Sequence, residues 1–256
     1  MLLGRFLMDH EFFKPFLSEN YEAPAQQRYF VYSRDVLKKE SIFPYYVLDG
    51  GAFFFMTEHF GDATSETLLK KTLTGEVFDL LRDADGKIDW GISYHTSEKT
   101  GMPKRHELQS WPQRLYMLLP LAQEFLKTGE TKYAKEWIRI LRLWLEASPY
   151  EPFRPDIPHI DTSMKWRDMQ VGWRTMTLMH SVFLLGTADG RALPRVDWLF
   201  VYRLIDLSLA HLVLECQKAM DANRYGNHVL QMGSVLISAG ILFAEFPRAK
   251  EYVSIG

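Results

Sequence analysis

The polar residues best suited to chemistry lie in one short segment, Asn223-Arg-Tyr-Gly-Asn-His228, directly before an apolar stretch. Gly226 permits a tight turn, and Asn227 then stands where a helix N-cap is expected. An amide and an imidazole at the start of an apolar helix need polar partners or a ligand. Asn227 and His228 are therefore candidate catalytic residues, and helix capping is the alternative explanation for Asn227.

Metal and nucleophile chemistry find little support in the sequence. The 8 His residues are scattered without a His-x3-His pair on one predicted helix, and the chain has a single cysteine, Cys216. This distribution does not predict a zinc site. The sequence also lacks a Gly-x-Ser-x-Gly elbow and a phosphate-binding glycine loop.

Paired carboxylates would point to a different enzyme class, the glycoside hydrolases. Five aspartates lie near predicted helix ends: Asp62, Asp89, Asp161, Asp168 and Asp221. Helix capping explains each of them separately, and no spacing in the sequence pairs two of them. A glycoside hydrolase on a helical toroid stays an alternative.

The elements that must position the candidate residues are helices. Apolar residues recur at 3–4 spacing over about 131–147. Comparable patterns predict helices from about 64 to a turn at 83–86, and over 107–127, 163–186, 195–220 and 227–245. Pro120 should kink or divide the predicted helix over 107–127. Short loops and the lack of a strand series predict an all-α fold of antiparallel helix pairs, such as a solenoid or an α/α toroid.

The N-terminal part differs from the rest of the chain. Residues 1–60 are irregular and aromatic-rich, which predicts an arm packed on a main helical domain over 61–256. The first residues begin like a signal peptide, but Arg5 and Asp9 interrupt the apolar run. The chain is thus either cytoplasmic or preceded by a removed signal. The most apolar stretch, 229–244, is short for a membrane span.

Composition narrows the classes of partner. Hydrophobic residues make up 47% and charged residues 24% of the 256 residues, which is ordinary for a globular protein. A net charge of -2 argues against nucleic-acid binding, which usually brings a basic excess. A polyanionic ligand would need only local Arg and Lys. The aromatic share of 14% indicates a large core, with a sugar-binding cleft as the alternative.

Several segments, in order over about residues 88–256, carry a resemblance. They are Trp111-Pro-Gln-Arg114, the run from Leu121 to Ala134, Trp144-Leu-Glu-Ala-Ser-Pro149, the span from Trp166 to Arg174, and Asn227-His228 with Phe246-Pro-Arg-Ala-Lys250 further on. Together they resemble the N-terminal helical domain of the heparinase II/III family of polysaccharide lyases, which includes oligoalginate lyases.

The resemblance implies an incomplete α/α toroid followed by a β-sandwich, and β-elimination at a uronic acid. Asn227 matches the residue that neutralises the uronate carboxylate, a charge-stabilising task that suits an amide. His228 matches its neighbour, which assists neutralisation or transfers protons. The substrate-binding residues implied are Trp111, Gln113, Arg114, Trp166, Arg174, Tyr225 and Gln231, with the two arginines as forks for carboxylate or sulfate.

The chain also departs from the family's pattern. Some members carry Glu where Gln231 stands, and the family's catalytic Tyr and a further His lie beyond Gly256. We therefore expect weak or no lyase activity from these 256 residues alone.

The implied partners are an acidic polysaccharide or oligosaccharide and a C-terminal β-sandwich of the same polypeptide. No cofactor is expected in this chain, although the resemblance allows a structural metal in the β-sandwich. It also implies a periplasmic or secreted location. A non-catalytic glycan- or protein-binding helical module is the second alternative to a lyase.

Overall fold

The computed structural model describes residues 65–79, 81–82, 85–90, 112–150, 164–186, 192–244 and 246–256. The helices over these residues are α5 (Ser65–Thr74), α6 (Glu76–Asp79), α8 (Leu118–Thr128), α9 (Thr131–Ala147), the 3-10 turn η5 (Met164–Trp166), α10 (Asp168–Gly186), α11 (Arg195–Asp221), α12 (Asn227–Leu242) and α13 (Ala249–Ile255). The β pairing in the described ranges is one isolated bridge, between Arg82 and Ile88. The predicted all-α class is therefore confirmed. The arm predicted over 1–60 lies outside the described residues.

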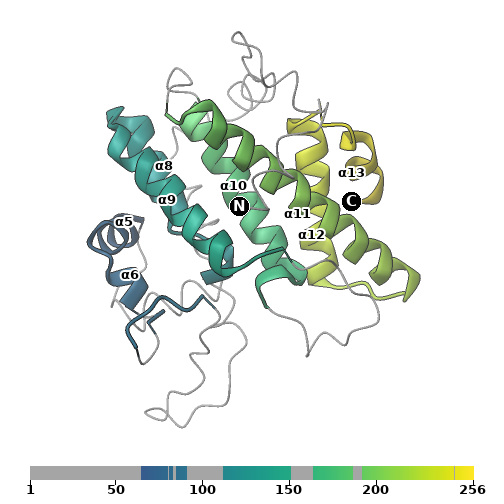
Figure 1. Cartoon of the computed structure of the whole chain (residues 1–256). Coiled ribbons are helices and arrows are strands. Elements are labelled where there is room, and N and C mark those ends of the chain that lie inside the picture. The colour runs from purple at the N-terminus through teal and green to yellow at the C-terminus, as the bar shows by residue number, and fades with distance from the viewer. Residues whose placement is uncertain are drawn as a thin grey trace.

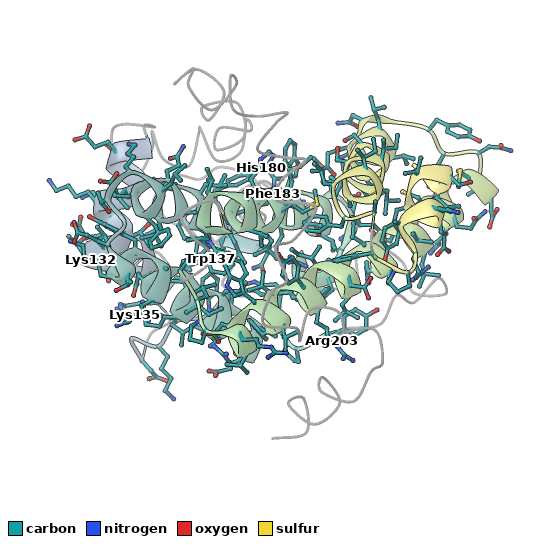
Figure 2. All side chains as sticks on the ribbon, turned by 90° about the horizontal axis from the view of Figure 1, so that it is seen from above. Lys132, Lys135, Trp137, His180, Phe183 and Arg203 are labelled. Carbon is teal, nitrogen blue, oxygen red and sulfur yellow. The ribbon has the colours of Figure 1, made fainter. Side chains whose placement is uncertain are left out.

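The longer helices form two layers. Helices that follow one another in the chain pack together, α8 on α9, α10 on α11 and α12 on α13, while α8, α10 and α12 are neighbours in one layer (Figure 1). Figure 2 shows His180 of α10 in one row and Lys132 of α9 and Arg203 of α11 in the other. α10 therefore occupies the middle of the molecule. Closure of these layers into an incomplete toroid stays a prediction.

The start of α8 differs from the predicted helix over 107–127. A helical turn at 112–114 is separated from α8 by a turn in which Leu115 adopts a left-handed φ of 56°. Pro120 then falls in the first turn of α8, where backbone N–H groups have no helical partner, so its missing N–H removes no bond. The predicted division of this helix near Pro120 is therefore seen, although the break lies just before the proline, at 115–117.

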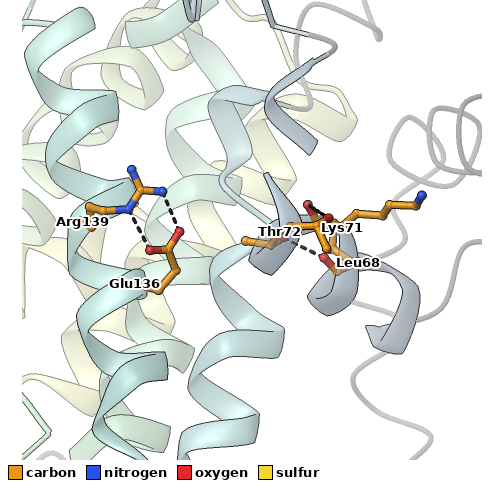
Figure 3. A network of polar contacts seen from close by, with 6 residues as sticks. Leu68, Lys71, Thr72, Glu136 and Arg139 are labelled. Carbon is orange, nitrogen blue, oxygen red and sulfur yellow. Dashed lines mark hydrogen bonds and ion pairs between the residues drawn. The ribbon is translucent and has the colours of Figure 1, made fainter. Parts of the chain in front are cut away.

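The predicted helix from about 64 is also interrupted. Gly75, with a φ of 82°, separates α5 from α6, and Lys71 pairs with Glu76 across this break. Within α5 the hydroxyl of Thr72 donates to the carbonyl of Leu68 at 2.7 Å (Figure 3). A glycine in the left-handed region ends a helix at little steric cost, which the hydrophobic pattern alone did not reveal.

The core is built mainly from the aromatic and aliphatic faces of α8 to α12. α9 has the bounds predicted from its periodicity, and its Trp137, Leu141 and Trp144 are fully buried. Its outer face carries an ion pair between Glu136 and Arg139 at 2.6 Å (Figure 3). The aromatic content therefore serves the core at these positions, as the simpler reading of composition expected.

α10 and α12 approach each other closely at Gly172. A Cβ placed on Gly172 would lie 2.3 Å from the side-chain oxygen of Gln231 on α12. A glycine in a helix interior is destabilising by roughly 0.5–1 kcal/mol relative to alanine. Its presence at this position is accounted for by the space that the Gln231 amide occupies.

The C-terminal part contains a helix that the sequence reading missed. α12 ends at Leu242 rather than near 245, and α13 follows and packs against it. α12 also leaves Leu230, Ile237 and Ile241 exposed, so it is not buried on all sides. No helix in the described ranges combines the length and the apolar character needed to cross a membrane.

His180 of α10 generates a prediction about pH. Burial lowers the pKa of His180 from 6.5 to about 4. The unfolded chain therefore binds a proton at higher pH than the folded protein, and stability should fall as pH drops from 6.5 through about 4. We expect His180→Gln to remove about 1–3 kcal/mol of this acid-induced loss. Urea unfolding of both proteins at pH 7 and pH 4.5 measures it, and equal losses in the two would contradict the assignment.

Candidate functional site

Asn227 and His228 form the first turn of α12. Gly226 occupies the N-cap position, and Asn227 is already inside the helix. Within the described part of the chain, the Asn227 side-chain amide has no hydrogen-bond partner, and residues 221–228 are all exposed. Capping by Asn227, the alternative explanation, therefore has no bond to support it.

His228 is held by an aspartate from another helix. Its Nδ1 lies 2.6 Å from Oδ2 of Asp168, the first residue of α10, and the two residues are 60 positions apart in the chain. The His228 side chain is 50% exposed and that of Asp168 is 20% exposed. This bond joins the N-terminal ends of α10 and α12. It uses only Nδ1 of the imidazole, and Nε2 takes no part in it.

Asp168 itself has an unusual backbone. Its φ of 52° is left-handed, a region that Asp and Asn enter more readily than most residues. The Met169 N–H donates to its Oδ1 at 2.6 Å, while its Oδ2 contacts His228 Nδ1, so the two carboxylate oxygens face different groups. The sequence reading had treated Asp168 as a helix cap or as half of a glycosidase pair. Its carboxylate instead contacts His228, while that of Asp221 accepts from Gln217.

Arg114 contacts the first turn of α10 from the core. Its side chain is buried, and its Nε donates to Oε1 of Gln170, in the first turn of α10, at 2.6 Å. Burial lowers the pKa of the Arg114 guanidinium, and attraction to Tyr116 and Asp168 opposes the shift. The Arg114 charge therefore acts on Asp168 from the protein interior, on the side away from solvent.

Three other residues of the predicted substrate-binding set are linked in the core, namely Gln113, Trp166 and Arg174. Arg174 is fully buried, its Nη1 donates to the Gln113 carbonyl at 2.9 Å, and its guanidinium lies 4.8 Å from the ring centre of Trp166. Trp166 donates from Nε1 to the Ser148 carbonyl at 3.0 Å. Burial lowers the pKa of Arg174 to about 9. Contact of Gln113, Arg114, Trp166 and Arg174 with sugar stays a prediction, but their burial favours a role in holding the fold around the site.

Two further residues from the predicted set lie close to the turn. Tyr225 is 73% exposed, two positions before Asn227. Gln231 follows His228 by one helical turn, and its buried amide atoms have no hydrogen-bond partner in the described part of the protein. Trp111 lies outside the described residues. Within those described, no group of three or more His, Cys, Asp or Glu is arranged to hold a metal ion.

Asp168 and Gln170 are the contacts that sequence reasoning missed. Each belongs to the segment from Trp166 to Arg174 that carried part of the resemblance, but that segment drew attention to its Trp and Arg. No local spacing could have paired Asp168 with a histidine 60 residues away. Its one local signal is its position at a helix start, which is common to many aspartates that act as caps.

Comparison with known proteins identifies the family of the chain. The sequence pattern of the Heparinase II/III N-terminus matches residues 18–256. Heparin-sulfate lyase of Bacteroides thetaiotaomicron is 23% identical over 178 residues, which cover 70% of this chain and 23% of that relative. No solved structure is a significant match. Since the family match covers nearly all of the 256 residues, the chain belongs to the heparinase II/III family and corresponds to its N-terminal part.

Proposed function

We propose that this chain is the helical, substrate-binding part of a polysaccharide lyase that cleaves uronic-acid-containing polysaccharides, of heparan sulfate or alginate type, by β-elimination. One observation carries the proposal: the Asn227 amide, which has no hydrogen-bond partner among the described residues, and the half-exposed imidazole of His228 are neighbours on the first turn of α12. Family membership and the printed name of the Bacteroides relative support the lyase class.

The first requirement of the reaction is a neutralised uronate carboxylate. Withdrawing its charge makes the proton on the adjacent C5 removable. The N-terminal end of a helix favours an anion, because its first N–H groups lack helical partners and the helix dipole is positive there. In the proposed complex the sugar carboxylate lies against the start of α12, and the Asn227 amide donates a hydrogen bond to it.

The second requirement is proton transfer, for which His228 is the candidate in this chain. An imidazole one residue from the carboxylate ligand can donate to the same carboxylate or exchange a proton with the sugar. The resemblance assigns the family's catalytic Tyr and another His to later parts of the polypeptide. The region of similarity is also under a quarter of the lyase relative's length, at 23%. We therefore propose that the activity belongs to the protein at its natural length. From the same resemblance we propose that it acts in the periplasm or outside the cell.

The remaining predicted residues are proposed to have different roles according to whether their side chains are exposed or buried. Tyr225 is proposed to stack on a sugar ring, since its aromatic face is open to solvent. The buried Arg114 and Arg174 are proposed to hold α8 and α10 in place, so that Asp168 and His228 meet.

Replacing Asn227 tests the carboxylate-neutralising role. In the protein at its natural length, Asn227→Ala should lower kcat/KM on a uronan by about 10²-fold or more, the usual loss for one charge-stabilising donor. Ultraviolet absorbance of the unsaturated product measures the rate.

Asn223→Gly is the matched control, because Asn223 is exposed in the same segment and has a left-handed φ of 52° that glycine tolerates. It should behave like the wild type. If the wild type forms unsaturated product from none of heparan sulfate, alginate and related uronans, the lyase proposal fails and a binding module becomes the better reading.

Tyr225 supplies a separate test of sugar stacking. Tyr225→Ala should raise KM for oligosaccharides about 3- to 10-fold with little change in kcat, as expected for loss of one aromatic contact. Tyr225→Phe should retain most of the affinity because the ring remains. Equal KM values for all three proteins would assign the ring no part in binding.

A further inference from the structure

We propose that Asp168 is the positioning residue for His228: its carboxylate keeps a proton on Nδ1, so that Nε2 is the nitrogen that removes the C5 proton. This inference rests on the proposed function and deepens it, since it selects between the two roles left open for His228. The main observation behind it is the 2.6 Å contact between His228 Nδ1 and Asp168 Oδ2.

The Asp168 carboxylate can only accept hydrogen bonds when it is ionised. Its Oδ1 is already engaged by the Met169 N–H at 2.6 Å, and its Oδ2 faces the imidazole. Two donors are therefore required, one of which is the backbone and the other Nδ1–H. In a neutral ring with its proton on Nδ1, Nε2 carries the lone pair.

The surroundings restrict the movement of Asp168. Its left-handed backbone is tied to its own side chain through Met169, and Arg114 attracts the carboxylate from the buried side. Gln170, which accepts from Arg114 Nε at 2.6 Å, anchors that arginine to the same turn of α10. The acceptor for His228 is thus held from both the backbone and the core.

The sugar's own connectivity fits two neighbouring residues. The carboxylate carbon is bonded directly to C5, so a group that holds the carboxylate and a group that takes the C5 proton must be adjacent. Asn227 and His228 are consecutive on an exposed turn. Of the two side chains only the imidazole is basic, so the C5 proton falls to His228 and the carboxylate to Asn227.

The step balances as follows. The Nε2 lone pair takes the C5 proton, and the C5–H electron pair forms the C4=C5 double bond. The bond from C4 to the glycosidic oxygen breaks, and that oxygen leaves with its electrons and takes a proton from water or another acid. The His228 imidazolium then returns its proton to water.

Asp168→Asn is the informative substitution, because Asn also tolerates a left-handed backbone. Its amide has a single oxygen, which the Met169 N–H will occupy, so its NH₂ group faces Nδ1. The imidazole must then accept at Nδ1 and carry its proton on Nε2. The ring can still donate from Nε2 but can no longer accept there.

The experiment combines ¹⁵N NMR of histidine-labelled protein at its natural length with lyase kinetics, and His228→Gln assigns the signal. We expect neutral His228 to be protonated on Nδ1 in the wild type and on Nε2 in Asp168→Asn. The kcat of this variant should fall by about 10²-fold or more with little change in KM, the range for loss of a general base. Asp221→Asn, an exposed aspartate that accepts from Gln217, is the matched control and should match the wild type in both readouts.

Three results would overturn the inference. One is a wild-type His228 with its neutral proton on Nε2, which can be seen even if the variant fails to fold. Another is an unchanged tautomer in a folded Asp168→Asn protein. The last is a reversed tautomer with unchanged kcat, which would leave His228 as a carboxylate ligand only. A wild type that cleaves no uronan sinks the proposed function and with it the base assignment, while the tautomer still decides what Asp168 does.

Discussion

Burial of the Arg174 guanidinium is the constraint around which the described helices are arranged. A charge removed from water must be met by strong local interactions, or the folded state is penalised by several kcal/mol. Arg174 meets a carbonyl, that of Gln113, and the faces of Trp144 and Trp166 at 4.2 and 4.8 Å. These contacts tie α10 to the turn before α8, to α9 and to η5. The position of Asp168, between η5 and the body of α10, follows from that connection.

The exposed turn of α12 depends on this buried framework in a second way. Arg114 belongs to the same turn as Gln113, and it reaches Gln170 and attracts Asp168. A chain of contacts therefore runs from the core to the solvent-exposed His228 through two charged residues. The link between Arg114 and Asp168 is an electrostatic attraction, and the other links are hydrogen bonds, from Arg114 to Gln170 and between Asp168 and His228. The buried residues Gln113, Arg114 and Arg174 thus contribute to the packing behind the turn that carries Asn227 and His228.

The fold was predictable where one helix face packs on the core along its whole length. α9 shows this best, because its apolar residues recur at helical spacing and its bounds, Thr131–Ala147, are those expected. Prediction failed where backbone conformation decides, as at Gly75 and Leu115, whose left-handed φ values leave no periodic trace. The division near Pro120 was predicted, but its exact position before the proline was not. For the site, Asn227 and His228 stood out because polar residues precede an apolar helix. Asp168 did not, since its partner comes from tertiary packing between helices 60 residues apart in sequence.

The close approach at Gly172 has a consequence for engineering this protein. The side chain nearest to it is Gln231, which is flexible and lies one turn from His228 on α12. A methyl group introduced at position 172 would meet the movable end of that amide rather than backbone, so the helices could remain in place while the amide is displaced. The surroundings of the polar turn can therefore be altered from the neighbouring helix, leaving Asn227 and His228 unmodified. Position 172 would thus adjust the position of the Gln231 amide through steric volume rather than through charge.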